Sequence, residues 1–77
     1  MLHADLNAND YRIASAVGEE CAHFGRITSV RVHRKPEPFV LIEMANREHA
    51  YELAFQKGGS MFGNCVLLHL EPLRRAA

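Results

Sequence analysis

The chain has 77 residues, of which 48% are hydrophobic and 23% are charged. A chain of this length forms one small domain, because it buries only about 60% of the surface that its unfolded form exposes. The hydrophobic share argues against intrinsic disorder. Nine basic and nine acidic residues give no formal net charge. This balance counts against a strong nonspecific nucleic-acid binder, since tight phosphate binding relies on a basic excess.

The two cysteines, Cys21 and Cys65, are too few for a disulfide framework and lack the clustered spacing of a zinc site. We expect both to be buried thiols in a reducing compartment. The apolar runs span only a few residues, and no charged-then-apolar leader opens the sequence. We therefore expect no membrane partner, and a nuclear or cytoplasmic location with the nucleus preferred.

The first expected element is a short strand within residues 1–7, where apolar and polar residues alternate. If Leu2, Ala4 and Leu6 face the core, His3 faces the other side of the sheet. A shift of one residue would put Leu2 in the place of His3. The sequence leaves both registers open, and we prefer the first.

An amphipathic helix is predicted next, over residues 10–24. Asn9 and Asp10 are good N-cap residues. Apolar residues then follow at spacings of four, four and three, which places them on one helix face; they are Ile13, Val17, Cys21 and Phe24. We expect Gly25 to end this helix in a left-handed conformation.

Two strands are predicted over residues 26–34 and 39–45, because Val30 and Val32 alternate with polar residues and 39–42 is an apolar run. The prolines at 36 and 38 exclude regular strand pairing between them, so a tight loop joins the strands. The basic pair Arg34-Lys35 at this loop is expected to be solvated.

A second helix is expected to begin at Asn46 and to end at Gly58-Gly59. Its inward residues are predicted to be Ala50, Leu53 and Ala54. Tyr51 and Phe55 lie off this stripe. They indicate either a partner surface or a wider edge of the core, and we prefer ordinary packing at the core.

The last strand is predicted over residues 64–70, with Val66, Leu68 and Leu70 inward and Pro72 closing it. Residues 73–77 are expected to form a flexible tail after a domain of residues 1–72. The order strand, helix, strand, strand, helix, strand predicts an α+β fold, a four-stranded antiparallel sheet with both helices on one face. The other face of the sheet is left open.

This order, together with residues 24–32, Phe39-Val40-Leu41-Ile42, His49-Ala50 and Met61-Phe62-Gly63-Asn64, resembles the RNA recognition motif (RRM) family. The resemblance covers almost the whole chain and implies a ferredoxin-type βαββαβ sandwich. The octapeptide of the family's third strand aligns with residues 35–42, where Lys35, Phe39 and Val40 match. Prolines replace both of its glycines, and Glu37 replaces its first aromatic residue.

The resemblance implies that single-stranded RNA binds the open face of the sheet, with modest affinity. Alternation places on this face Ser29, Arg31, His33, Phe39, Leu41, Leu67 and His69, with His3 beside them. A base can stack on Phe39 while Arg31 and Lys35 approach phosphates. The expected RNA-binding residues are His3, Arg31, His33, Lys35, Phe39, Leu41 and His69.

A protein-interaction module is the alternative. The UHM subclass of RRMs holds a peptide tryptophan with an acidic first helix and an Arg-x-Phe loop after the second helix. Glu19, Glu20 and Phe62 resemble this site, although Ser60 stands in place of the arginine. The nucleoporin-type RRM, which forms homodimers, is similar across residues 54–68, so self-association is a further alternative.

Catalytic and metal-binding patterns are weak. The serines lack the context of a nucleophile elbow, and Gly58-Gly59 closes a helix where a phosphate cradle opens one. No nearby cysteine or acid pair completes a metal site with the histidines at 3, 33 and 69. We therefore expect no enzymatic activity, no metal and no cofactor.

Overall fold

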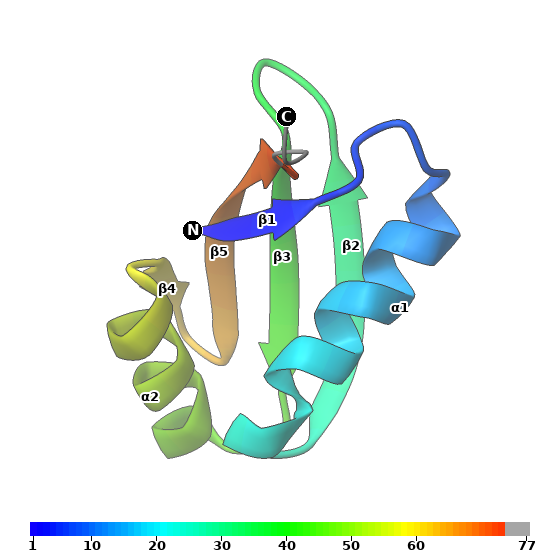
Figure 1. The fold of residues 1–77 in the computed structure, drawn as a ribbon. Coiled ribbons are helices and arrows are strands. Elements are labelled where there is room, and N and C mark those ends of the chain that lie inside the picture. Colours follow the sequence, from blue (N-terminus) through cyan, green and yellow to red (C-terminus); the bar gives the residue numbers. More distant parts are fainter. Residues whose placement is uncertain (74–77) are drawn as a thin grey trace.

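A computed structural model, which describes residues 1–73, places two helices over one face of a β-sheet (Figure 1). The elements in chain order are β1 (Leu2–Ala4), α1 (Asp10–Cys21), a 3₁₀ turn η1 (Ala22–Phe24), β2 (Ile27–His33), β3 (Phe39–Met44), α2 (Arg47–Lys57), β4 (Ser60–Phe62) and β5 (Cys65–Pro72). The predicted α+β class is confirmed. In the described part of the chain, no helix is both long enough and apolar enough to cross a membrane.

The helix boundaries follow local sequence signals. The Asn9 side chain accepts a hydrogen bond from the N–H of Arg12 and caps α1, and the Asn46 side chain accepts from the N–H groups of Glu48 and His49 at the start of α2. Gly58 ends α2 in the left-handed conformation, with φ +68°. The first helix ends at Cys21, three residues before the predicted end, and continues as η1.

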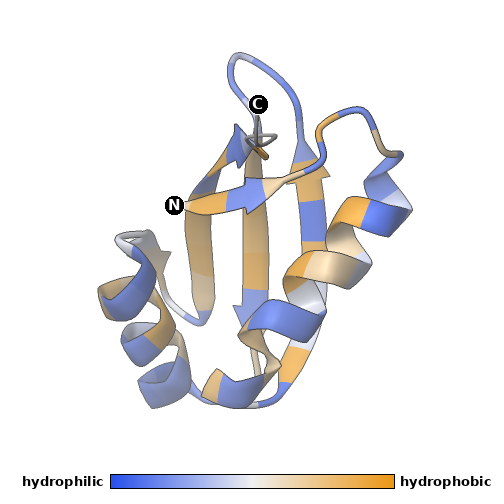
Figure 2. Cartoon of the chain, in the orientation of Figure 1, coloured by the Kyte–Doolittle hydropathy of each residue, from blue (hydrophilic) through white to orange (hydrophobic). Residues whose placement is uncertain are grey.

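A single core lies between the sheet and the helices. The paired inward residues Val40 and Leu68, and the next pair Ile42 and Val66, are fully buried. They join the helix residues in one cluster, which contains Leu2, Ala4, Ile13, Val17, Cys21, Val40, Ile42, Met44, Ala50, Leu53, Ala54, Val66, Leu68 and Leu70. Figure 2 shows the matching pattern, with hydrophobic residues alternating along β2 and filling much of β3. The predicted inward stripes of both helices and of the last strand are confirmed.

The sheet is mixed and has five strands, so the predicted four antiparallel strands are wrong. Its order is β1-β5-β3-β2, and β4 also pairs with β5. The β2–β3, β3–β5 and β4–β5 pairs are antiparallel, whereas β1 runs parallel to β5, with Leu2 opposite Leu70. β5 pairs with β3 along one edge. Along its other edge it pairs with β4 at Cys65–Leu67 and with β1 at Leu70–Pro72.

Two features of β5 explain the difference. This strand continues to Pro72, two residues beyond the predicted end, and the added residues are the ones that pair with Ala4 and His3. A three-residue strand carries no local signal of its partner or direction, because alternation fixes only which side chains face the core. Residues 60–62, for which no strand was predicted, form β4 and pair with β5. A tight turn joins the two strands, and Gly63 in this turn has φ +61°.

The expected tail begins with a paired residue. The N–H of Leu73 donates to the carbonyl oxygen of Ala4 over 3.0 Å. The other residues of the predicted tail, 74–77, lie outside the described residues. Leu73, the first residue of the predicted tail, is thus hydrogen-bonded to β1.

Arg34 joins the end of β2 to the segment that connects β1 with α1. Its guanidinium donates to the carbonyl oxygens of Leu6 and Ala8, at 2.7 and 2.9 Å, and to the Asp10 carboxylate at 2.8 and 3.0 Å. Arg34 is exposed, as expected. Its hydrogen bonds were not predicted, because the partners lie 24 to 28 residues earlier in the chain and no local pattern marks them.

Replacement of Arg34 by alanine is expected to lower the free energy of unfolding by about 1–2 kcal/mol, because several charge-assisted hydrogen bonds are lost at a partly exposed site. Arg34→Lys should recover only part of this loss, since an ammonium group cannot reproduce the planar fork. Urea denaturation measures both variants. A Lys35→Ala variant is the control, and equal midpoints for Arg34→Ala and Lys35→Ala would contradict a structural role of Arg34.

Candidate nucleic-acid interface

One face of the sheet carries no helix. The strand residues that alternate with the core residues point to this face, which we call the outer face. On β2, β3 and β5 they form rows across the sheet, because the strand register places Ser29 beside Glu43 and Cys65, Arg31 beside Leu41 and Leu67, and His33 beside Phe39 and His69. The outer-face assignment made from alternation is therefore confirmed.

An aromatic row crosses three strands at one end of this face. Phe39 on β3 lies between His33 on β2 and His69 on β5 in the strand register. The His33 and Phe39 rings stack with their centroids 4.8 Å apart and their planes 10° apart. Phe39 is half-buried while both histidines are exposed. His33 therefore covers one face of the Phe39 ring, and the row forms a partly apolar aromatic surface on the outer face.

The two remaining predicted RNA-binding residues flank this row. The preferred register of the first strand is confirmed, since Leu2 and Ala4 are buried and His3 is exposed. His3 lies opposite Glu71, with His3 Nε2 3.9 Å from Glu71 Oε2. Because β5 separates β1 from β3, His3 is not a direct neighbour of Phe39. Lys35 is exposed in the loop between His33 and Phe39.

A hollow of about 130 Å³ opens in the outer face next to the aromatic row. Its lining comes from β2, β3 and β5 and consists of Ser29, Arg31, Leu41, Glu43 and Cys65. It therefore combines a cation, an anion and an apolar floor. Within residues 1–73 no ion pair joins Arg31 to Glu43, so both charged groups keep hydrogen-bonding capacity for a ligand.

Glu43 and Cys65 line this hollow but were not predicted on the outer face. The Thr28 hydroxyl donates to Glu43 Oε1 over 2.9 Å, and the Cys65 thiol lies 3.9 Å from Glu43 Oε2. The strand register shifts between Ile27 and Ser29, which brings Thr28 beside this carboxylate. Alternation along β3 could have placed Glu43 on the outer face, because it follows Phe39 and Leu41 at the same spacing of two residues.

The two cysteines have different environments. Cys21, the last residue of α1, is fully buried, and its burial, with a smaller effect of Glu20, raises the pKa of its thiol to about 11. Cys65 is only half-buried and lines the hollow of the outer face. The prediction of two buried thiols is wrong for Cys65, because the residue lies at an outward position of β5.

The predicted peptide site is divided between the two layers of the domain. Glu19 and Glu20 are exposed in the last turn of α1. Phe62 lies in β4 opposite Cys65, while its neighbour Met61 packs against the core, so Phe62 points to the outer face. A peptide that contacts Phe62 on the sheet therefore does not meet the acidic helix end on the same surface.

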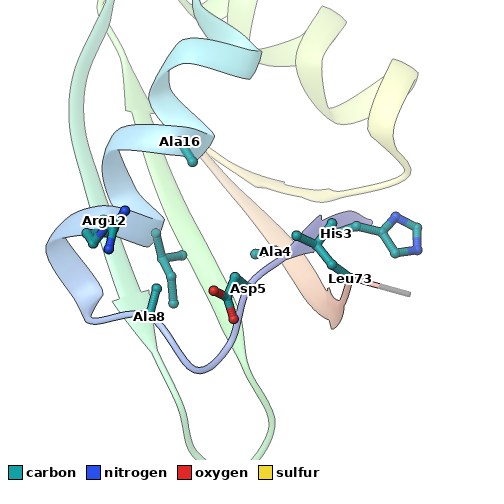
Figure 3. Close-up of a pocket in the computed structure, with 8 residues that line it drawn as sticks. His3, Ala4, Asp5, Ala8, Arg12, Ala16 and Leu73 are labelled. Carbon is teal, nitrogen blue, oxygen red and sulfur yellow. The ribbon is translucent and has the colours of Figure 1, made fainter. Parts of the chain in front are cut away.

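A second hollow, of about 250 Å³, lies between β1 and α1 (Figure 3). Most of its lining is small or apolar, with His3, Asp5 and Arg12 as polar members: His3, Ala4, Asp5, Ala8, Arg12, Ile13, Ala16 and Leu73. In Figure 3 the His3 ring points away from the labelled alanines. The hollow results from small side chains at facing positions, and its polar groups form no recognisable catalytic or ligand-binding arrangement.

Tyr51 and Phe55 form an exposed aromatic pair on α2. Their ring centroids are 6.4 Å apart, and their exposed fractions are 62% and 71%. The expectation that they widen the core is wrong, because Ala50, Leu53 and Ala54 already fill the contact of this helix with the sheet. The pair lies on the helical layer, away from the outer face.

The histidines at 3, 33 and 69 do not converge. In the described range, no three His, Cys, Asp or Glu side chains gather closely enough to hold a metal ion. His33 and His69 lie on either side of Phe39, and His3 lies beside Glu71. Their arrangement along the outer face is instead that of side chains available to a bound ligand.

Comparisons with family models, with curated proteins and with solved structures found no match to this chain. The resemblance to the RRM family therefore stays a prediction.

Proposed function

We propose that this domain binds single-stranded RNA with modest affinity through the outer face of its sheet, as an RRM-like module without enzymatic activity. The observation that carries the proposal is the aromatic row of His33, Phe39 and His69 across three adjacent strands. Unpaired bases stack on such rings in single-stranded nucleic-acid binding, largely independently of sequence.

Charge near the row supports the same function. Arg31 and Lys35 are exposed on either side of His33 in sequence, and neither is engaged in an ion pair among residues 1–73. They can contact phosphates while the bases lie on the sheet. Two such contacts are few, which agrees with the zero formal net charge of the chain and with a modest affinity.

Phe39→Ala is expected to weaken binding of short single-stranded RNA by about 1–3 kcal/mol, because a stacking surface is lost. The fold should persist, since Phe39 is only half-buried on the outer face. Fluorescence anisotropy with a pool of short RNAs measures the affinity, and circular dichroism checks the fold. Phe55→Ala is the matched control, because it removes an exposed ring from α2 and should leave the affinity unchanged.

The salt dependence of the same titration tests the mode of binding. Two phosphate contacts predict that the logarithm of the association constant falls with the logarithm of salt concentration with a slope of about −1.4. RNA binding that Phe39→Ala leaves intact would contradict the proposed face. Absence of RNA binding by the parent protein would contradict the function itself.

Protein interaction is the second candidate, and one observation favours it. Phe62 is 62% exposed beside the half-buried Cys65, and Leu41 and Leu67 continue the apolar surface toward Phe39. Such a strip also suits a peptide or a second copy of the domain. A parent protein that sediments as a dimer and binds no RNA would favour this candidate over the first.

A further inference from the structure

We infer that the hollow between Arg31 and Glu43 selects guanine from the bases of single-stranded RNA. This inference rests on the proposed function and names the base that the outer face prefers. It concerns residues next to the aromatic row, where Phe39 supplies stacking but no hydrogen bonds that distinguish one base from another.

The hollow is preorganised around the Glu43 carboxylate. Thr28 Oγ1 donates to Glu43 Oε1 at 2.9 Å and to the Glu43 carbonyl oxygen at 3.2 Å. The carboxylate is thus held at the edge of the hollow, and it has further lone pairs with which to accept hydrogen bonds. Glu43 is exposed, so a ligand reaches these lone pairs without entering the core.

Arg31 provides donors on the same hollow. Residues 31 and 43 lie on neighbouring strands, one row apart, since Arg31 pairs with Leu41 and Glu43 pairs with Ser29. They share the lining of the hollow, yet no ion pair forms between them among residues 1–73. A ligand that presents donors on one side and acceptors on the other can therefore bridge them, with Leu41 as the apolar floor.

Guanine has this pattern. Its N1–H and N2–H groups are adjacent donors that match the two oxygens of a carboxylate, and its O6 and N7 atoms are adjacent acceptors that match a guanidinium. Adenine presents an N1 acceptor and an N6 donor at the corresponding positions, so it would oppose acceptor to acceptor and donor to donor. Uracil offers a single N3–H donor, and cytosine offers one amino group beside an acceptor.

The position of the hollow agrees with a bound strand. Phe39, Leu41 and Glu43 point the same way along β3, at steps of about 6.8 Å for every two residues. Leu41 and Glu43 line the hollow and lie one and two of these steps from Phe39 in the aromatic row. A strand that stacks one base on Phe39 can place a neighbouring base between Arg31 and Glu43.

The test uses oligouridines that carry one central guanine, inosine, 7-deazaguanine or adenine, titrated into the parent protein. We expect the guanine probe to bind at least about tenfold more tightly than the adenine probe. Inosine lacks the N2 amino group and 7-deazaguanine lacks the N7 acceptor, so each should lose part of the preference. Glu43→Gln should bring guanine and adenine to within about threefold, because the amide replaces one acceptor with a donor.

Glu52→Gln is the control, since it removes the same charge from α2 on the opposite side of the sheet and should keep the guanine preference. Binding that depends on Phe39 but shows no preference for guanine would overturn the inference and leave RNA binding intact. A guanine preference that persists in Glu43→Gln would overturn it as well. Failure of every probe to bind would overturn both the inference and the proposed function.

Discussion

Leu68→Ala is expected to lower the free energy of unfolding by about 2–5 kcal/mol, because it deletes a fully buried side chain from the centre of the core. Leu68 lies opposite Val40 on β3 and packs near Gly59 at the start of the β4–β5 hairpin. The chain has 77 residues, so its total stability is about 4–12 kcal/mol. One such loss is a large fraction of this value.

Leu67→Ala is the matched control for this prediction. It removes the same atoms from the adjacent residue of β5, but Leu67 is half-buried on the outer face, so its loss should be well below that of Leu68. Urea denaturation measures both midpoints. Val17→Ala, on the buried stripe of α1, should cost at least about 1 kcal/mol and tests the helix side of the same core. Equal midpoints for Leu67→Ala and Leu68→Ala would refute the assigned strand faces.

Local features of this fold could be predicted from the sequence because they depend on neighbouring residues. Asn9 and Asn46 cap the helices through bonds to N–H groups two or three residues away. The inward and outward positions of β3 and β5 follow from a period of two. The same period places Arg31 and Phe39 on the outer face, so most of the candidate site was accessible to this reasoning.

Features that depend on distant residues could not be predicted. The choice of β5 as the partner of β1, in parallel orientation, is decided by contacts nearly seventy residues apart, such as Leu2 with Leu70. The bonds of Arg34 to Leu6 and Ala8 also span a long separation in sequence. The hollow beside Glu43 exists only because three strands meet in one register, so its lining residues carry no joint pattern in the sequence.

The environment of Gly25 depends both on neighbouring residues and on a distant one. A glycine after the first helix was predicted from its position, in the left-handed conformation of a helix end. The structure gives it φ +147° and ψ −174°, an extended conformation at positive φ, immediately after η1. The predicted left-handed conformation is wrong, although Gly25 does follow the helical segment as expected and its positive φ favours glycine. The close approach of His49, on α2, to Gly25 could not be predicted from the sequence.

Gly25→Ala is expected to destabilise the domain by at least about 2 kcal/mol. An alanine at this φ is strained, and its Cβ would lie 2.3 Å from Nδ1 and 2.8 Å from Cβ of His49. Gly18→Ala is the matched control, because a Cβ there meets no atom within 4 Å and α1 gains helix propensity, so stability should rise by about 0.5–1 kcal/mol.

The cause of the Gly25 effect can be separated by a second variant. His49→Ala in the Gly25→Ala background removes the ring but keeps the β-carbon and the backbone strain, so it should restore only part of the lost stability. Thermal and urea denaturation of the parent, both single variants and the double variant give the coupling. A Gly25→Ala protein as stable as Gly18→Ala would show that neither the positive φ nor the approach of His49 constrains this junction between α1 and β2.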